Sequence, residues 1–383
     1  MRVLLTGGGT AGHINPALAI AQTVQQNDPG AVIEFVGIAG GKETELVPRE
    51  GFSLHFVKSQ GFKRSLSLSN FRAAWLFLTS PYAKQTTDII KNFQPDVVIG
   101  TGGYACWPLM AAAARMGIPT AVHESNSIPG LAIRLLQKKV DRIWTNFEST
   151  AGYLKIPEKA LRVGNPLRGG FGGISKEEAR RRLGISEDCM FLLSFGGSLG
   201  AENINRAVVR MMKDFCAWEP RVLHRHAAGK RDYQTALEDF RSQGLEACEN
   251  CEMTEYIYDM SLQMAAADLV ICRAGAMTLS ELALLQKACV LIPSPYVAEN
   301  HQYMNAKTLA DAGAAILIEE SSLESGLLTQ RVKDALGDSS KLQSLEKNIT
   351  AFADPFANKR IWEELISLTG KAPAKPLEAY QKG

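Results

Sequence analysis

Short apolar runs alternate with amphipathic segments along the whole chain. The runs cover residues 3–6, 32–36, 97–100 and 120–123, and then residues 191–195, 222–224, 269–272 and 290–292. Apolar strands separated by helical patterns are typical of parallel sheets with crossover helices. The pattern predicts an α/β protein made of two doubly wound, Rossmann-like halves.

A segment rich in Gly and Pro, residues 163–170, separates the two series of strands. Such residues favour a linker, so we expect one domain over residues 1–165 and a second over residues 166–351. A further helix, over about residues 352–370, is expected to pack back on the first domain. Residues 371–383 are expected to form a mobile tail.

Composition limits the class of protein. The chain has 383 residues and a net charge of +2, which fits two domains and gives no overall field to attract nucleic acid. Its 7 cysteines are an odd number, which favours a reducing compartment over a disulfide scaffold. The apolar runs are too short to span a bilayer, and the first residues indicate a strand, not a secretion signal.

Glycine-rich turns follow the first strand of each half. The first turn is Gly7-Gly8-Gly9-Thr10-Ala11-Gly12-His13, and the second is Gly196-Gly197-Ser198-Leu199-Gly200-Ala201. Glycines at a strand-to-helix turn let backbone N–H groups approach a phosphate, although a tight turn without a ligand is the simpler alternative. Ligands of such sheets bind at the carboxyl ends of the strands, so we expect the two turns to face one cleft.

A third segment with candidate chemistry runs from Arg273 to Glu281. It is predicted to form a strand end, a glycine turn and the start of a helix. Glu281 lies about one turn inside that helix, where a carboxylate could accept hydrogen bonds from two ribose hydroxyls. Taken alone, stabilisation of the helix N-terminus is the simpler interpretation of this carboxylate.

Six motifs together resemble the MurG family of bacterial glycosyltransferases, in the same order and spacing, from residue 1 to about residue 315. They are Gly8-Gly9-Thr10-Ala11-Gly12-His13, Gly102-Gly103-Tyr104, His123-Glu124-Ser125-Asn126, Gly164-Asn165-Pro166-Leu167-Arg168, residues 196–201 and residues 273–281. The resemblance implies two Rossmann-like domains in the GT-B arrangement, with the lipid-linked acceptor held by the first and UDP-N-acetylglucosamine mainly by the second.

The resemblance also implies a set of binding residues. Those for UDP-N-acetylglucosamine are Thr10, Ala11, Gly12, Asn126, Arg168, Ser198, Ile257, Ala276, Met277, Thr278, Leu279, Ser280, Glu281, His301 and Gln302. Glu281 would hold the ribose, Ile257 would present backbone to the uracil, and Arg168 and Ser198 would contact the phosphates. Gly102, Gly103 and Tyr104 would lie on the acceptor side. Several positions depart from the family pattern, among them Ala11, Ser125, Glu299 and His301. These departures concern the details of the sugar contacts and not the reaction.

The implied reaction is an inverting transfer to the C4 hydroxyl of undecaprenyl-pyrophosphoryl-N-acetylmuramoyl-pentapeptide, in peptidoglycan synthesis. His13 is the candidate general base, because an imidazole accepts protons near neutral pH, and Glu124 is the second candidate. No Asp-x-Asp motif is present, so we expect no metal and no cofactor, with Arg168 and backbone amides stabilising the leaving group.

Two alternatives remain open at this point. One is a related transferase that uses another lipid acceptor, such as diacylglycerol. The other is a UDP-sugar epimerase, or a regulator that binds sugar nucleotides, on the same fold. The expected partners are the two substrates, an anionic membrane surface and other cell-wall synthesis proteins, with no nucleic acid. The expected location is peripheral, at the cytoplasmic face of the inner membrane, with roles in cell shape and cell division.

Three further features of the sequence are weaker signals of function. Residues 63–78 carry basic and aromatic side chains that would suit a membrane-facing surface or a core-facing helix equally well. Cys248 and Cys251 have the spacing of a metal or redox pair, but no second pair follows, so an incidental role is favoured. His224 and His226 lie on one side of a predicted strand without nearby carboxylates, which disfavours a metal site.

Overall fold

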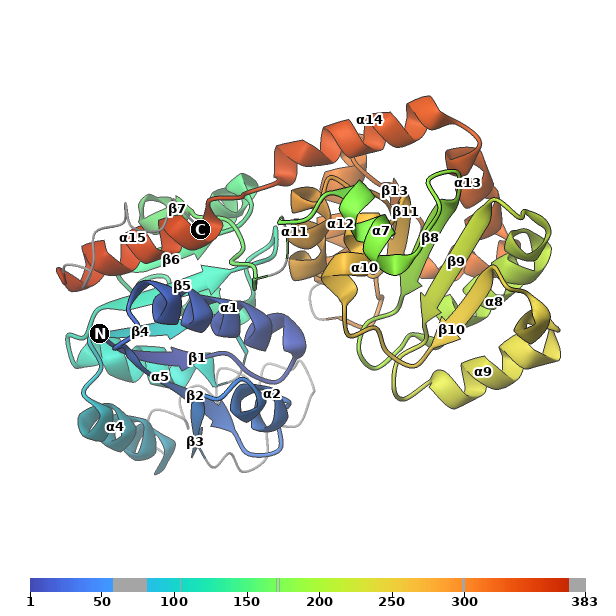
Figure 1. The fold of residues 1–383 in the computed structure, drawn as a ribbon. Coiled ribbons are helices and arrows are strands. Elements are labelled where there is room, and N and C mark those ends of the chain that lie inside the picture. The colour runs from blue at the N-terminus through green and yellow to red at the C-terminus, as the bar shows by residue number, and fades with distance from the viewer. Residues whose placement is uncertain (58–80, 104, 170, 172, 298–299, 372–383) are drawn as a thin grey trace. The chain divides into compact units, whose positions relative to one another are not determined.

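The computed structural model describes residues 1–57, 81–103, 105–169, 171, 173–297 and 300–371. Residues 63–78, Tyr104, Glu299 and the expected tail beyond residue 371 therefore lie outside the described residues. The chain divides into two compact units, one of Met1–Arg168 together with the segment from Phe356 onward, the other of Gly169–Pro355 (Figure 1).

The first unit is built on a parallel seven-stranded sheet with the order β3-β2-β1-β4-β5-β6-β7. Its strands are β1 (Arg2–Thr6), β2 (Val32–Ile38), β3 (Ser53–Val57), β4 (Val97–Gly100), β5 (Thr120–Glu124), β6 (Arg142–Thr145) and β7 (Ala160–Arg162). The order turns back at β1 and β4, which places a topological switch point at the carboxyl ends of these two strands.

Helices cover both faces of this sheet. They are α1 (Ala11–Asn27), α2 (Glu43–Arg49), α4 (Pro81–Phe93), α5 (Cys106–Arg115), α6 (Leu131–Leu136) and α15 (Ala357–Thr369). Successive residues of β1 point to opposite faces: Val3 and Leu5 pack with α1 and α15, and Leu4 packs with α4 and α5. This alternation is the strand period of two, so β1 is buried on both sides.

The second unit repeats the architecture with a parallel six-stranded sheet in the order β10-β9-β8-β11-β12-β13. The strands are β8 (Met190–Phe195), β9 (Val222–Ala227), β10 (Cys251–Thr254), β11 (Leu269–Cys272), β12 (Ala288–Leu291) and β13 (Ile316–Leu317). The helices are α7 (Lys176–Leu183), α8 (Glu202–Asp214), α9 (Tyr233–Ser242), α10 (Met260–Ala266), α11 (Ala276–Leu284), α12 (His301–Asp311), α13 (Leu327–Leu336) and α14 (Ser339–Ile349). Here the switch point lies at β8 and β11.

The prediction of two doubly wound α/β halves is confirmed. α15 contacts α1 within the first unit, and the Asn358 side chain makes hydrogen bonds of 3.0 and 2.8 Å to the backbone N–H and carbonyl of Leu167. Among the described residues, no helix combines the length and apolar content needed to cross a bilayer.

Candidate functional site

The first glycine turn joins β1 to α1 and leaves little room for side chains. A Cβ on Gly7 would lie 2.1 Å from Thr101 Oγ1, and a Cβ on Gly103 would lie 2.2 Å from the Gly8 carbonyl oxygen. Gly9 and Gly103 both have φ near +85°, a backbone conformation that favours glycine. The turn after β4 is thereby packed directly against the turn after β1.

A buried carboxylate, Glu43 at the start of α2, holds the first glycine turn. Its Oε2 accepts a hydrogen bond of 2.9 Å from the Gly9 N–H, and its Oε1 accepts one of 3.0 Å from the Ile38 N–H. A Cβ on Gly8 would meet this side chain at 2.6 Å. Glu43 belongs to none of the sequence motifs, and its only signal is the run of small residues, Ala39-Gly40-Gly41, that comes shortly before it.

His13 lies in the first turn of α1, half-buried, with its ring against the turn after β4. Its Nδ1 is 3.1 Å from the Thr101 carbonyl oxygen, and a Cβ on Gly102 would lie 2.6 Å from Nδ1. Because a carbonyl can only accept, Nδ1 carries the proton, and the lone pair of the neutral ring is on Nε2. The imidazole is therefore held in the tautomer that a general base at Nε2 requires.

Glu124, the second candidate base, is buried at the end of β5 and engaged by its own loop. Its Oε1 accepts hydrogen bonds of 2.9 Å from both the backbone N–H and the side-chain amide of Asn126. Its Oε2 accepts a hydrogen bond of 2.8 Å from the Gly130 N–H. The carboxylate thus fixes the position of Asn126 and the loop that follows.

His123, beside Glu124, is fully buried and bonded to the linker. Its Nε2 lies 2.9 Å from the Gly164 carbonyl oxygen, which places the proton on that nitrogen. Burial lowers the pKa of His123 to about 4. This histidine stays neutral at physiological pH and anchors the linker to β5.

Arg168 ends the first unit and packs on the N-terminal part of α1. Its guanidinium donates to Glu50 Oε1 at 2.9 Å and to Asn15 Oδ1 at 3.2 Å. The side chain is about one-third exposed. A phosphate contact, as the family resemblance implies, would have to share this guanidinium with Glu50.

The second glycine turn, between β8 and α8, has an exposed tip and a tightly packed base. Gly197 and Gly200 have φ of +97° and +96°, and Ser198 at the tip is exposed. A Cβ on Gly200 would lie 2.3 Å from the Ala228 carbonyl oxygen. An open N-terminal turn of this kind presents backbone N–H groups that suit an anion.

α11 begins beside this turn, after the end of β11, and places the predicted nucleotide-binding residues in different environments. Ala276, Met277 and Leu279 are buried, so any ligand contact from them comes from the backbone. Ser280 Oγ donates to the Ala276 carbonyl oxygen at 3.2 Å, and Glu281 is half-buried. Thr278 and Ser280 are also half-buried, so Thr278, Ser280 and Glu281 are the members of this segment whose side chains combine polarity with partial exposure.

The remaining predicted residues of the second unit follow strands β10 and β12 in the chain. Ile257 is buried between two exposed residues, Tyr256 and Tyr258, whose rings pack edge to face at 4.9 Å. His301 and Gln302 begin α12, where Gln302 Oε1 accepts a hydrogen bond of 2.8 Å from the Ser294 N–H.

The predicted site residues therefore gather in two groups, one in each unit. The first group comprises Thr10, Ala11, Gly12, His13, Gly102, Gly103, Glu124, Asn126 and Arg168. The second comprises Ser198, Ile257, Ala276, Met277, Thr278, Leu279, Ser280, Glu281, His301 and Gln302. Each group lies at or just beyond the carboxyl ends of its own parallel strands, as expected for doubly wound sheets.

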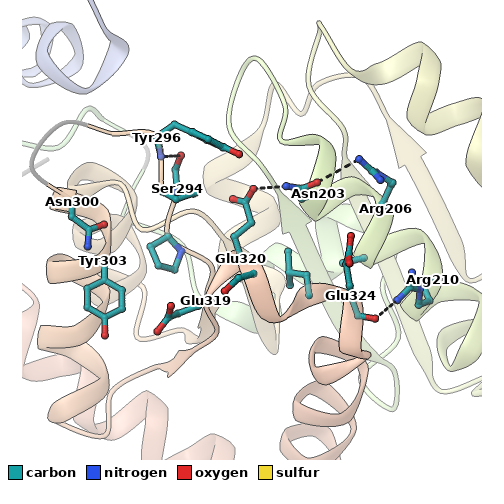
Figure 2. A pocket seen from close by; sticks show the side chains of 15 residues that line it. Asn203, Arg206, Arg210, Ser294, Tyr296, Asn300, Tyr303, Glu319, Glu320 and Glu324 are labelled. Carbon is teal, nitrogen blue, oxygen red and sulfur yellow. Dashed lines mark hydrogen bonds between the residues drawn. The ribbon is translucent and has the colours of Figure 1, made fainter. Parts of the chain in front are cut away.

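The second unit also carries a cavity of about 670 Å³, between α8 and the loops that follow β12 and β13 (Figure 2). Its polar lining includes Asn203, Arg206, Arg210, Ser294, Tyr296, Asn300, Tyr303, Glu319, Glu320 and Glu324. Sequence reasoning did not identify this cavity, because its walls come from segments that lie far apart in the chain.

His224 and His226 are part of a buried hydrogen-bonded chain. Ser194 Oγ lies 2.8 Å from both His224 Nε2 and His226 Nδ1, and His226 Nε2 lies 3.0 Å from Asn205 Oδ1. Burial lowers the pKa of His226 to about 4 and holds that of His224 well below its usual value. Among the described residues, no group of three or more His, Cys, Asp or Glu side chains is arranged to hold a metal ion.

Comparison with protein families matches both units. Residues 3–145 match the glycosyltransferase family 28 N-terminal domain, and residues 191–361 match the C-terminal domain of that family. A protein of Acetivibrio thermocellus is 42% identical over 95% of this chain and 97% of its own length. One of Thermoanaerobacter sp. is 39% identical over 96% of this chain and its full length. Both are named UDP-N-acetylglucosamine–N-acetylmuramyl-(pentapeptide) pyrophosphoryl-undecaprenol N-acetylglucosamine transferase.

Solved structures resemble the whole chain. The MurG of Acinetobacter baumannii is 25% identical, with a TM-score of 0.74 over 96% of this chain and 99% of its own. A UDP-GlcNAc 2-epimerase from Neisseria meningitidis bound to UDP-GlcNAc has a TM-score of 0.64 over 96% of this chain and all of its own, at 14% identity. The second likeness shows a shared fold alone, so the fold does not separate transferases from epimerases.

Proposed function

Because the chain belongs to glycosyltransferase family 28, we propose that it transfers N-acetylglucosamine from UDP-N-acetylglucosamine to undecaprenyl-pyrophosphoryl-N-acetylmuramoyl-pentapeptide, the step from lipid I to lipid II in peptidoglycan synthesis. The observation that carries this function is similarity along the whole chain. Relatives that are 37–42% identical over at least 91% of this chain share one activity name.

The second unit is the proposed donor-binding half. Its glycine turn at residues 196–201 offers backbone N–H groups to the diphosphate, with Ser198 at the exposed tip. Glu281 is half-buried on α11, where its carboxylate would accept hydrogen bonds from two ribose hydroxyls. Ile257, buried between two exposed tyrosines in the sequence, would offer only its backbone to the uracil.

The first unit is the proposed acceptor-binding half, and His13 is its base. In the proposed step, the acceptor C4 hydroxyl attacks the anomeric carbon of the donor sugar while its proton passes to Nε2 of His13. The bond from the anomeric carbon to the UDP oxygen breaks, so UDP leaves with the electron pair and the configuration at that carbon inverts. The hydrogen bond between Nδ1 and the Thr101 carbonyl supports this role, because it places the lone pair of the neutral ring on Nε2.

Two other residues take supporting roles in this proposal. The three hydrogen bonds that Glu124 accepts favour a role in positioning Asn126 rather than in proton transfer. Arg168 would stabilise the leaving diphosphate, together with the helix N-termini of the donor half. Its existing ion pair with Glu50 means that this contact would compete with Glu50 for the guanidinium.

A comparison of acceptors tests the function. Purified enzyme is incubated with radiolabelled UDP-N-acetylglucosamine and either lipid I or diacylglycerol, and the lipid products are separated. We expect label in the lipid I product and none in diacylglycerol, because the relatives are named for the muramyl acceptor. Labelled diacylglycerol, with unlabelled lipid I, would assign the chain to the alternative acceptor.

Attachment to the surface of an anionic membrane is a further part of the proposal, because the acceptor carries a polyprenyl chain. The candidate surface is residues 63–78, which lie outside the described residues. Sedimentation with vesicles should increase with anionic lipid and decrease with salt, since salt screens surface charges. Sedimentation that depends on neither would contradict this surface. The same proposal places the protein at the cytoplasmic face of the inner membrane. It also includes contacts with other cell-wall synthesis proteins and roles in cell shape and cell division.

A further inference from the structure

One carboxylate in the second unit joins segments that are distant in the sequence. Glu320, the first residue of the short helix after β13, accepts a hydrogen bond of 2.6 Å from the side-chain amide of Asn203 through Oε1. Its Oε2 forms an ion pair with Nη1 of Arg273. Figure 2 shows the Glu320 side chain directed at Asn203, along the wall of the cavity.

Arg273 extends this contact to a third segment. The same Nη1 atom donates to the Ile292 carbonyl oxygen at 3.2 Å, just beyond the end of β12. The Arg273 and Glu320 side chains are only 14% and 7% exposed. We call Asn203, Arg273, Glu320 and the Ile292 carbonyl the Glu320 bridge.

The members of the Glu320 bridge adjoin the donor-binding segments. Asn203 is the second residue of α8 and follows the glycine turn that carries Ser198. Arg273 directly precedes the Ala274-Gly275 turn, from which α11 begins. Glycine turns have few side chains that can pack. The distance between these two turns therefore depends on the contacts that the neighbouring residues make.

From this arrangement we propose that Glu320 is a positioning residue for UDP-N-acetylglucosamine. By holding Asn203 and Arg273 on one carboxylate, it sets the separation between the phosphate-binding turn and the start of α11. This inference rests on the proposed function, in which those two segments bind one donor molecule. In this proposal Arg273, the first residue of the motif that contains the nucleotide-binding residues, has a structural role as the partner of Glu320.

Electrostatics make the bridge dependent on both charges. A largely buried guanidinium is tolerated because a carboxylate and a carbonyl satisfy it, and removal of the carboxylate leaves an uncompensated charge. The segment around Arg273 would then have to move to rehydrate the guanidinium. Movement of that segment changes the distance between α11 and the glycine turn, and with it the fit of the donor.

The first experiment compares Glu320→Ala and Glu320→Gln with Glu324→Ala. Glu324 lies on the same short helix, is exposed, and accepts from Arg210 through its backbone carbonyl, so its substitution keeps that bond. We expect Glu320→Ala to raise the Kd for UDP and the donor KM by about 10-fold or more, the effect of losing charged hydrogen bonds. The acceptor KM should stay unchanged, Glu320→Gln should lie between, and Glu324→Ala should match wild type.

A second variant separates positioning from stability. Arg273→Met combined with Glu320→Leu removes both charges, and replacement of a buried ion pair by apolar residues often preserves folding. We expect its Tm to recover relative to Glu320→Ala while its donor KM stays raised. A lowered Tm with an unchanged Kd for UDP in Glu320→Ala, or a wild-type donor KM in the double variant, would overturn the proposal. The function itself fails separately, if wild-type enzyme binds UDP but transfers no sugar to lipid I.

Discussion

Two histidines of the first unit show how the local backbone sets the chemistry of one side-chain type. His123 is fully buried, donates to the Gly164 carbonyl and has a pKa lowered to about 4. His13 is half-buried and donates to the Thr101 carbonyl through Nδ1, so its Nε2 carries the lone pair. Of the two, only His13 has the partial exposure that proton exchange with a substrate requires.

Substitution of His13 tests this assignment. General-base catalysis contributes roughly 10² to 10⁴ in rate, so His13→Ala should lower kcat by about that range with UDP affinity nearly unchanged. His13→Asn can keep a hydrogen bond to Thr101 but cannot accept the proton, and it should be similarly slow. The control is His55→Asn, a partly exposed histidine of the same unit. A near-wild-type kcat for His13→Asn would move the base to another group, with Glu124 the next candidate.

Glu281 is the corresponding test residue in the donor half. Its proposed contact is with the ribose, which UDP and UDP-N-acetylglucosamine share, so Glu281→Ala should weaken both to the same extent. A hydrogen bond to a charged group contributes about 1.5 to 3 kcal/mol, equivalent to about 10- to 150-fold in Kd. Titration calorimetry measures this directly. Unchanged UDP affinity in a folded variant would show that the ribose is bound elsewhere.

At the scale of elements, the glycine turns depend on side chains that come from other segments. Glu43 reaches from α2 to the Gly9 N–H, and Glu320 reaches from the helix after β13 to α8 and the end of β11. Both carboxylates are almost fully buried. The turns thus obtain their shape from tertiary contacts as well as from their glycines.

Glu43→Ala should therefore destabilise the first turn and slow the reaction. The variant removes the acceptor of two backbone N–H groups. Each of these groups that stays buried without a hydrogen-bond partner lowers the free energy of unfolding by about 1 to 3 kcal/mol. We expect a lower Tm together with a lower kcat, since the turn leads directly into the helix that carries His13. Glu45→Ala is the matched control, because Glu45 is exposed in the same helical turn. Equal behaviour of the two variants would contradict a role for Glu43.

Sequence patterns predicted the glycine turns but not the carboxylates that support them. Glycine spacing after an apolar strand is a local signal, whereas Glu43 and Gly9 are far apart in the chain and meet only in the folded sheet. The apolar stretch from Ala17 to Val24 predicts the helix after the first turn, but that helix begins earlier. It starts at Ala11 and includes Pro16, because Gly12 and His13 adopt helical geometry despite weak local preference.

At the scale of the whole molecule, the alternation of strands and helices was sufficient to predict the architecture. Central strands such as β1, β4, β8 and β11 are buried on both faces and give continuous apolar runs. Short edge strands give weaker signals, and β7 and β13 were not among the runs that the sequence singled out. The family resemblance supplied the chemistry that periodicity alone leaves undetermined.

Buried neutral histidines predict acid sensitivity of the whole molecule. His123 and His226 have pKa values lowered to about 4, and that of His224 is lower than usual. Below pH of about 6.5 the unfolded chain binds protons that the folded chain excludes, so stability is lost as the pH falls toward 4. At pH 5, burial of each of His123 and His226 should lower the free energy of unfolding by about 2 kcal/mol relative to neutral pH. Equal urea midpoints at pH 7 and pH 5 would contradict this burial.

The central claim is that the chain catalyses transfer between two substrates, and the dependence of UDP release on acceptor tests it most directly. Purified enzyme is given UDP-N-acetylglucosamine with and without lipid I, and free UDP is measured over time. We expect release of one UDP for each lipid II formed, and negligible release without acceptor. Epimerised donor sugar, or UDP released at the same rate without lipid I, would contradict it and favour the epimerase alternative.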